Sequence, residues 1–331
     1  MIILKIKSKA YAIAFWQTRI GELLNQIYGL RIFLKFSFTQ DKLLNKSGHE
    51  AYLTKQYHIV EKGMALSEPR KFFGKKKIFD LITKSEEYIK TYGDSELTAS
   101  IRAALDTYLD RNMGLESHDK EMHDKILNFC SSSDSRNISG VKLVSKNDII
   151  KANNFSYEDF VTTRSSVRNF SEDSVLDADI YEAIRLASNT PSVCNRQSWK
   201  VHYYKEKSMI SKLLVIQNGN GGFADSIDKL LIITTDTRKF TRLESNQVFI
   251  DGGLFAMNVL LSLHSLKLGS CCLNTCLSYV DENNVKRVGE IPHSERLIMM
   301  IGVGSLKDKY EVAYSKKYNE QELIEDHGYN I

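Results

Sequence analysis

Two arginines and a serine at alternate positions form the first group of residues that could bind a ligand. Arg164, Ser166 and Arg168 stand in the sequence TTRSSVRNF, with Ser165 between the first two. In an extended segment, alternate side chains point to the same face. Two guanidinium forks and a hydroxyl on one face are typical of a site for a dianion. A solvated basic turn is the alternative interpretation of these residues.

The second group is a polar connector that ends in one of only two tryptophans. Residues 190–199 read TPSVCNRQSW, where Pro191 would end a helix and Trp199 would begin a strand. A helix stop followed by a turn is one interpretation, and a connector that lines a ligand is the other. The residues that would then contact the ligand are Pro191, Ser192, Asn195 and Gln197.

The third group is basic and follows the last apolar run of the chain. Lys316 and Lys317 end the stretch GSLKDKYEVAYSKK. Like the arginines of the first group, they supply positive charge that could meet an anionic ligand.

A dinucleotide fingerprint occurs in the sequence, but its spacing argues against that function. Gly219, Gly221 and Ala224 match the pattern GxGxxA, and the residues LLVIQ before them could be a strand. Only residues 225–229 separate this motif from the next apolar run. A parallel crossover with its helix needs about ten residues or more, so we do not expect a Rossmann unit.

No metal or hydrolase motif has the required spacing. His118 and His123 are five residues apart, whereas the metalloprotease pattern needs four. Cys271, Cys272 and Cys276 lack paired CxxC spacing, and the pattern GxSxG is absent. We interpret these three cysteines as buried core thiols. Five cysteines make no disulfide framework, so we expect a cytoplasmic protein.

The elements that must position these groups can be predicted from composition and caps. We expect strands at Trp199–Tyr204, Leu230–Thr235 and Arg296–Val303. Ser156 is expected to cap a short helix that ends before Thr163, and Asp179 to cap a helix over 180–188.

A longer helix, Gln247–Leu268, is apolar on nearly every side. Such a helix either spans a membrane or lies in a core or an interface. Four polar residues argue against the membrane: Asp251, Asn258, His264 and Lys267. Gly252 and Gly253 would each cost about 1 kcal/mol in an exposed helix interior, so we expect close approach of another backbone or a flat ligand there.

Length and charge bound the remaining possibilities. A chain of 331 residues is long for one core, and a net charge of +4 gives no argument for nucleic acid. Residues 1–130 read as mostly helical, and 131–140 as a Ser-rich linker. We therefore predict a helical N-terminal extension at 1–140 and a second domain at 150–331.

The N-terminus is basic and moderately apolar. Lys5, Lys7 and Lys9 precede an uncharged run from Ala10 to Thr18. This run is too short to span a bilayer and no small-x-small cleavage site follows it. A basic amphipathic helix within residues 1–35 that contacts a membrane surface is kept as an alternative to a purely cytoplasmic location.

In their order and spacing, these groups resemble the FMN-dependent nitroreductase family. The pattern is Arg-x-Ser-x-Arg with a following Phe, a helix, Pro-Ser-x-x-Asn-x-Gln and Trp, then a long helix with a Gly-rich start and a small-residue loop. The resemblance covers residues 155–325. It implies an α+β, three-layer sandwich with a central, mostly antiparallel sheet and a long interface helix, here preceded by an all-α extension.

The resemblance also implies a homodimer with two FMN sites at the subunit interface, each built from both chains. Arg164 and Ser166 would bind the phosphate, Arg168 would lie nearer the ribityl chain, and Asn195 would hydrogen-bond the polar edge of the ring. Gly269 and Ser270 match the loop near the redox-active nitrogen. The full set expected to contact FMN is Arg164, Ser165, Ser166, Arg168, Pro191, Ser192, Asn195, Gln197, Gly269, Ser270, Lys316 and Lys317.

In this family the flavin carries the chemistry, so no catalytic side chain is expected. NADH or NADPH would give a hydride to FMN and leave, and a small organic substrate would then be reduced in the same pocket. Fixed cations and amide donors near the pyrimidine favour the reduced flavin. The alternatives are a flavin-dependent dehydrogenase or oxidase and a non-catalytic membrane-surface scaffold.

The sequence departs from the family pattern at three places that bear on FMN affinity. Ser198 stands where a second proline is usual, Ser165 where a basic residue is common, and the C-terminal contact is Lys rather than Arg.

The extension has a resemblance of its own. Residues 57–74 resemble a segment of nitroreductase-like proteins associated with bacterial surface-polysaccharide synthesis. Within it, Gly63 is expected to be a helix C-cap. The polar residues are either structural or part of a lid over the flavin: His58, Glu61, Lys62 and Arg70.

Overall fold

The computed structural model describes residues 15–16, 18–39, 45–66, 69–131, 139–143, 145, 154–313, 315 and 317–328. Three sequence predictions fall wholly or largely outside these residues: the lysines at 5, 7 and 9, most of the Ser-rich linker, and Lys316. The boundary between the two predicted domains therefore remains a proposal.

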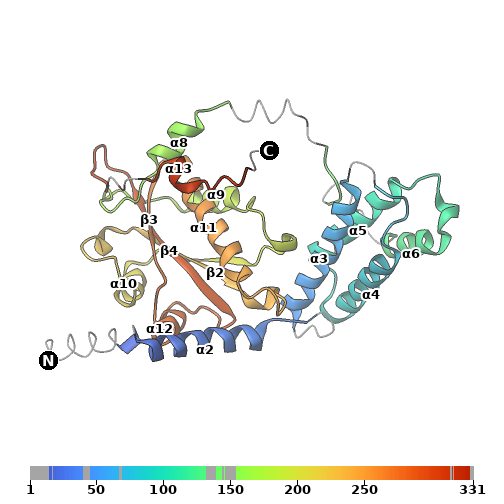
Figure 1. Cartoon of the computed structure of the whole chain (residues 1–331), viewed down its shortest axis with the longest axis horizontal. Coiled ribbons are helices and arrows are strands. Elements are labelled where there is room, and N and C mark those ends of the chain that lie inside the picture. The colour runs from blue at the N-terminus through green and yellow to red at the C-terminus, as the bar shows by residue number, and fades with distance from the viewer. Residues whose placement is uncertain are drawn as a thin grey trace.

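A four-stranded antiparallel sheet forms the centre of the C-terminal half (Figure 1). Its strands are β1 (Trp199–Tyr204), β2 (Lys229–Asp236), β3 (Leu268–Leu273) and β4 (Glu295–Ser305), in the order β1-β2-β4-β3. The three predicted strands are confirmed as β1, β2 and β4. Strand β2 is buried along its whole length because it has a neighbour on each edge and helices over both faces.

The prediction of a small-residue loop after the long helix is wrong. Gly269 and Ser270 lie in strand β3, which pairs with β4 from Leu268–Ser305 to Leu273–Met300. The sequence LGSCCL has no β-branched residue, so its strand conformation comes from pairing with β4 rather than from local preference.

Helices cover both faces of the sheet and make a three-layer α+β unit. One face packs against α9 (Asp177–Ala187) and α11 (Gln247–Ser265), and the other against α10 (Lys207–Ile216) and α12 (Tyr279–Val288). Alternate residues of β2 serve the two cores: Leu231 and Ile233 face α11, whereas Leu230 and Ile232 face α10. The expected fold class is confirmed.

Two local predictions in this unit need correction. Helix α9 begins at Asp177 after Leu176, two residues before the predicted Asp179 cap, and has no side-chain cap. The residues LLVI before the GxGxxA pattern belong to helix α10 rather than to a strand, which removes the remaining basis for a dinucleotide fingerprint.

Helix α11 is a core helix. Among the described residues it is the one helix long and apolar enough to cross a membrane, yet half of that window is buried, against α9, β2, β3 and β4. Its two glycines differ. A Cβ at Gly252 would lie 2.6 Å from Ile298 Cγ1, so this glycine lets α11 approach the sheet closely, whereas a Cβ at Gly253 would meet open space.

Four helices of the N-terminal half form a second core. They are α3 (Lys46–Met64), α4 (Lys75–Tyr92), α5 (Glu96–Asp110) and α6 (Lys120–Cys130). Helix α3 continues through Gly63, so the predicted C-cap is wrong; a Cβ there would lie 2.4 Å from the Phe73 ring, which explains the glycine by packing.

Helix α2 (Arg19–Phe36) is N-terminal in sequence but packs on the sheet unit, along the lower edge in Figure 1. It contacts α12 and the turn η4 (Thr237–Lys239). The remaining short elements are η1 (Glu116–His118), α8 (Tyr157–Thr163), η2 (Val193–Asn195), η3 (Ala224–Ser226) and α13 (Glu320–Leu323).

Candidate functional site

The arginine-rich segment is held in an extended conformation beside strand β3. It leaves α8, which Ser156 caps as predicted, and Ser166 forms a parallel bridge with Ser270. The Val167 amide donates to the Ser270 carbonyl at 2.9 Å. Val167 is buried, whereas Arg164 and Ser166 are half-buried and Arg168 is exposed, so the alternate residues share the outer side of the segment.

The two guanidinium groups of this segment carry uncompensated positive charge. Neither Arg164 nor Arg168 forms an ion pair with a described carboxylate, and Arg168 makes only a long hydrogen bond, 3.4 Å, to the Ser166 carbonyl. Burial lowers the pKa of the nearby His264, and the charge of Arg164 lowers it further. Burial raises the pKa of Cys271 on the other side, against the charge of Arg168. Both neighbours are therefore neutral near pH 7 and leave the arginine charge unopposed.

Gly269 and Ser270 lie beside the arginines but are buried. Ser270 exposes only 3% of its surface. A Cβ at Gly269 would lie 3.0 Å from Phe170, so packing of that ring accounts for the glycine. Lys317 is exposed and has no hydrogen bond or ion pair with another described residue.

The connector between α9 and β1 has an unusual backbone. Cys194, Asn195 and Gln197 have φ angles of 50°, 53° and 45°, in the left-handed region. Asparagine tolerates this region, but cysteine and glutamine seldom adopt it. Such residues cost on the order of 1–3 kcal/mol each and persist where the surroundings fix them, often at ligand sites.

Hydrogen bonds, a ring contact and a buried ion pair of Arg196 with Glu244 at 2.8 Å fix the connector. The Val193 amide donates to both carboxylate oxygens of Asp251, at 3.2 and 3.3 Å, and the Gln197 amide donates to Ser192 Oγ at 3.0 Å. The Trp199 ring stacks on Phe255 of α11, with 4.6 Å between ring centroids, and so anchors the end of the connector on this helix. Burial raises the pKa of Asp251 despite these hydrogen bonds.

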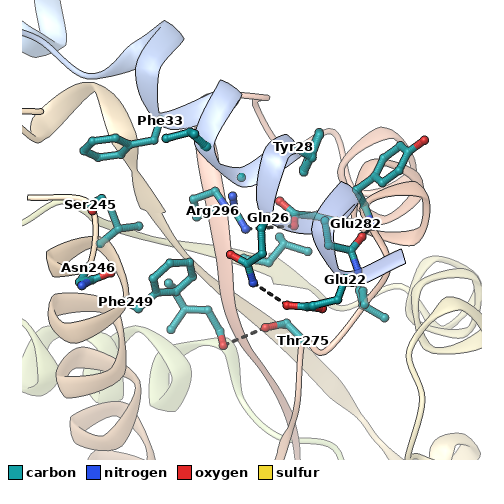
Figure 2. A pocket seen from close by; sticks show the side chains of 18 residues that line it. Glu22, Gln26, Tyr28, Phe33, Ser245, Asn246, Phe249, Thr275, Glu282 and Arg296 are labelled. Atoms are coloured by element: carbon teal, nitrogen blue, oxygen red, sulfur yellow. Dashed lines mark hydrogen bonds and ion pairs between the residues drawn. The ribbon is translucent and has the colours of Figure 1, made fainter. Parts of the chain in front are cut away.

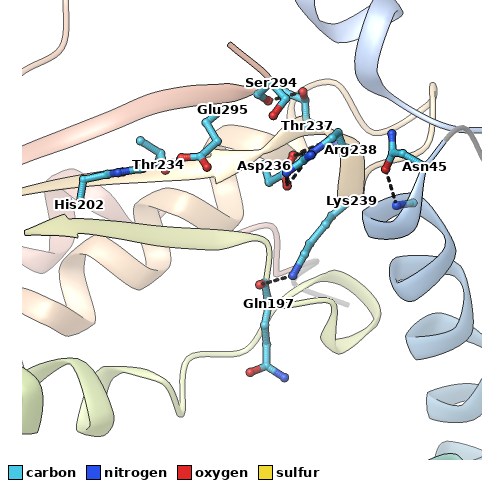
Figure 3. A network of polar contacts seen from close by, with 11 residues as sticks. Asn45, Gln197, His202, Thr234, Asp236, Thr237, Arg238, Lys239, Ser294 and Glu295 are labelled. Atoms are coloured by element: carbon cyan, nitrogen blue, oxygen red, sulfur yellow. Dashed lines mark hydrogen bonds and ion pairs between the residues drawn. The ribbon is translucent and has the colours of Figure 1, made fainter. Parts of the chain in front are cut away.

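One cation beside the connector was not found from the sequence. Lys239 reaches from η4 to the Gln197 carbonyl, with Nζ at 3.3 Å (Figure 3). Burial lowers its pKa, and the charge of Lys200 adds to the shift. Its neighbour Arg238 is paired with Asp236 at 2.7 Å, whereas Lys239 forms no ion pair with a described carboxylate. A lysine three residues after the end of a buried strand was the signal that could have pointed to it.

One chain does not bring the arginine segment and the connector together. Thr163 Oγ1 lies 3.1 Å from His264 Nε2 near the end of α11, whereas Val193 binds Asp251 near its start. The thirteen residues between them correspond to a rise of about 20 Å along the helix. The two predicted groups therefore lie at opposite ends of α11.

A cavity of 480 Å³ lies between α2 and the sheet unit, and it contains none of the predicted FMN contacts. Figure 2 shows Glu22 and Gln26 of α2 on one side and Asn246 and Phe249 of α11 on the other. Its volume is in the range of small-molecule sites. The cavity borders the connector through the packing of Val193 with Phe33, Phe240 and Val248.

The extension contacts the site through the start of α3 rather than through the predicted lid residues. Helix α3 contacts η2 and η4. A Cβ at Gly48, in the first turn of α3, would lie 3.6 Å from the Arg238 carbonyl oxygen. Glu61 instead accepts hydrogen bonds from Ser139 Oγ and the Gly140 amide, and His58 lies 3.2 Å from the same carboxylate group. These contacts favour a structural role for this segment. Among the described residues, no group of three or more His, Cys, Asp or Glu side chains could hold a metal.

The C-terminal half is similar to known proteins. The model of the nitroreductase family matches residues 161–220 and 210–305. Similar solved structures include an FMN-dependent nitroreductase of Clostridium difficile (18% identity, 52% of this chain and 99% of that chain, TM-score 0.46). A nitroreductase family protein of Streptococcus pneumoniae has 22% identity over 51% of this chain and 99% of that chain, with TM-score 0.43. No curated protein matches the chain.

Proposed function

We propose that this chain, in which residues 161–305 match the nitroreductase family, is an FMN-dependent oxidoreductase. It takes electrons from NADH or NADPH and reduces a small organic substrate. The observation that carries the proposal is that Arg164 and Arg168 lie beside β3, within the matched region, and form no ion pair with a described carboxylate.

The residues present fit FMN at both of its polar ends. The arginine segment offers two cationic forks and the hydroxyls of Ser165 and Ser166 to a phosphate dianion. The connector offers the amide side chains of Asn195 and Gln197, with Lys239 beside them, to the pyrimidine edge. Bound FMN would supply the hydride transfer. Cations and donors fixed at its pyrimidine edge would stabilise negative charge on the reduced form.

The separation of the two groups along α11 supports a site shared between two copies of the chain. One face of α11 is apolar and uncovered: Phe249, Ile250, Leu254 and Met257 are 45–51% exposed. Gly253 on this face meets open space and would allow a second backbone to approach. A homodimer through α11 would cover these residues and bring the connector of one copy to the arginine segment of the other.

The described residues do not test the other parts of the functional prediction. The cytoplasmic location and the link to surface-polysaccharide synthesis both remain predictions.

The visible spectrum of the purified protein, before and after addition of FMN, tests the proposal. We expect bound flavin in the parent and at least about tenfold weaker FMN binding in Arg164→Ala, because hydrogen bonds to charged groups contribute about 1.5–3 kcal/mol. Arg185→Ala removes an exposed arginine paired with Glu182 on α9 and is the matched control, with unchanged binding expected. A colourless protein indifferent to FMN would contradict the proposal and favour a non-catalytic scaffold.

Anaerobic mixing with NADH and NADPH tests the direction of electron flow. Rapid bleaching of the flavin by either nucleotide is expected for a reductase. A flavin that neither nucleotide reduces would instead point to a dehydrogenase or oxidase that takes electrons from its substrate.

A further inference from the structure

Helix α2 presents an aliphatic stripe that no described residue covers. Six large aliphatic side chains recur along one face at intervals of three or four residues, with one adjacent pair. They are 38–65% exposed: Ile20, Leu23, Leu24, Ile27, Leu30 and Leu34. Scattered exposed leucines are ordinary on protein surfaces, but a stripe of this length marks an interaction site.

The stripe faces outward because the opposite side of α2 is fixed on the sheet unit by directional contacts. Tyr28 Oη donates to Asn283 Oδ1 at 2.9 Å, and Asn25 Oδ1 accepts from the Tyr279 amide at 2.8 Å. A Cβ at Gly29 would lie 2.7 Å from Arg296 Nη1, so this glycine lets α2 lie directly over the guanidinium group. Rotation of α2 to bury its stripe would break all three contacts.

The charges around the stripe are all positive. At about 100° per residue, Arg19 and Lys35 flank the aliphatic residues and Arg31 lies among them. All three are exposed, and none forms an ion pair with another described residue. The one carboxylate of the helix, Glu22, points to the other side, where it lines the cavity and accepts from Gln26 at 2.6 Å.

This combination favours one occupant. Pairing of two α2 helices from two copies of the chain would place these cations near one another, with no carboxylate on the stripe to offset them. An anionic bilayer surface matches both features, because interfacial helices bury an aliphatic face at the acyl boundary while their cations meet lipid phosphates. We propose that α2 docks the protein on an anionic membrane surface. This inference goes beyond the proposed reaction and does not require FMN.

Co-sedimentation of the full-length protein with lipid vesicles tests the inference. Vesicles of phosphatidylglycerol and phosphatidylethanolamine are compared with vesicles of phosphatidylcholine alone. We expect binding to the anionic vesicles, weakened by raised salt, and little binding to phosphatidylcholine. Arg19→Gln, Arg31→Gln and Lys35→Gln combined should remove the preference for anionic lipid.

A matched pair of double variants isolates the aliphatic contribution. Leu23→Ser with Leu34→Ser removes two leucines from the stripe, and Leu143→Ser with Leu243→Ser removes two exposed leucines elsewhere. The first pair should weaken vesicle binding by about tenfold or more, and the second should leave it unchanged. Thermal unfolding checks that both remain folded.

Two results would overturn the inference. One is full vesicle binding by Leu23→Ser with Leu34→Ser, which would place the lipid contact elsewhere in the chain. The other is no vesicle binding by the parent together with a change of oligomeric state, measured by light scattering, in that same variant. This second result would assign the stripe to a contact between copies.

Discussion

Substitution of Asp251 by alanine tests whether the connector is held in its strained conformation from α11. The Asp251 carboxylate accepts from the Val193 amide and from Gln247 Nε2, the latter at 2.7 Å. Asp251→Ala removes both acceptors. The three left-handed residues 194, 195 and 197 would then keep the Ser192 hydrogen bond and the Trp199 anchor. The buried ion pair of Arg196 with Glu244 and the hydrogen bond from Lys239 to the Gln197 carbonyl would also remain.

The expected magnitude follows from two opposing effects. A hydrogen bond to a charged group contributes about 1.5–3 kcal/mol, and the bonds from Val193 are long, which favours the lower end. Against this, burial raises the pKa of Asp251, so removing the carboxylate also relieves a desolvation cost. A net loss of about 1–2 kcal/mol in connector positioning corresponds to about 5–30-fold weaker FMN binding.

Titration of flavin fluorescence against the apoprotein measures this effect, with thermal unfolding measured in parallel. Asp251→Asn is the matched control, since its amide oxygen can still accept from the Val193 amide. We expect Asp251→Asn to bind FMN within a few fold of the parent and Asp251→Ala to bind it clearly more weakly. Equal FMN affinity in the parent and Asp251→Ala would refute the role given to this carboxylate.

Three further outcomes are expected. Burial raises the folded-state pKa of Asp251 above its unfolded value, so the folded parent binds a proton on this carboxylate more tightly than the unfolded chain does. The free energy of unfolding of the parent, relative to that of Asp251→Asn, should therefore rise as pH falls from 7 toward 4, and urea denaturation measures it. Gly252→Ala should destabilise the protein by about 1–3 kcal/mol through the clash with Ile298, and a melting temperature equal to that of the parent would contradict this packing. Lys239→Ala should lower the midpoint potential of bound flavin by on the order of 30 mV, which is about 1.4 kcal/mol for a two-electron couple, and an unchanged potential would place Lys239 away from the ring.

The elements whose signal lies in their own residues were predicted from the sequence. Strand β2 is a run of aliphatic and β-branched residues, and α11 has one long apolar stretch. The helix ends at Ser265, three residues before the predicted end at Leu268, which belongs to β3. Strand β3 was missed because glycine, serine and cysteine have little strand preference, and only pairing with β4 makes them a strand.

The same distinction explains the error at Gly63 and the missing cation. Gly63 was interpreted by its local use as a cap, but its reason is the Phe73 ring ten residues later. Lys239 was not singled out because its position beside Gln197 depends on where β2 ends and places η4 next to the connector. Contacts between segments distant in sequence are not encoded in residue spacing.

The order of the motifs also conceals which chain supplies them. Arg164 to Arg168 and residues 191–197 are close in sequence, and their spacing alone does not say whether one chain or two supply them; only the family resemblance implied a site built from both chains. The structure places them at opposite ends of α11, about 20 Å apart by helix rise, with an uncovered apolar face between them. We propose that a ligand that needs both groups meets them where a second copy lies along that face. If FMN binds and the protein is a dimer, substitution of Leu254 by aspartate should therefore weaken FMN binding and dimerisation together, since one face serves both.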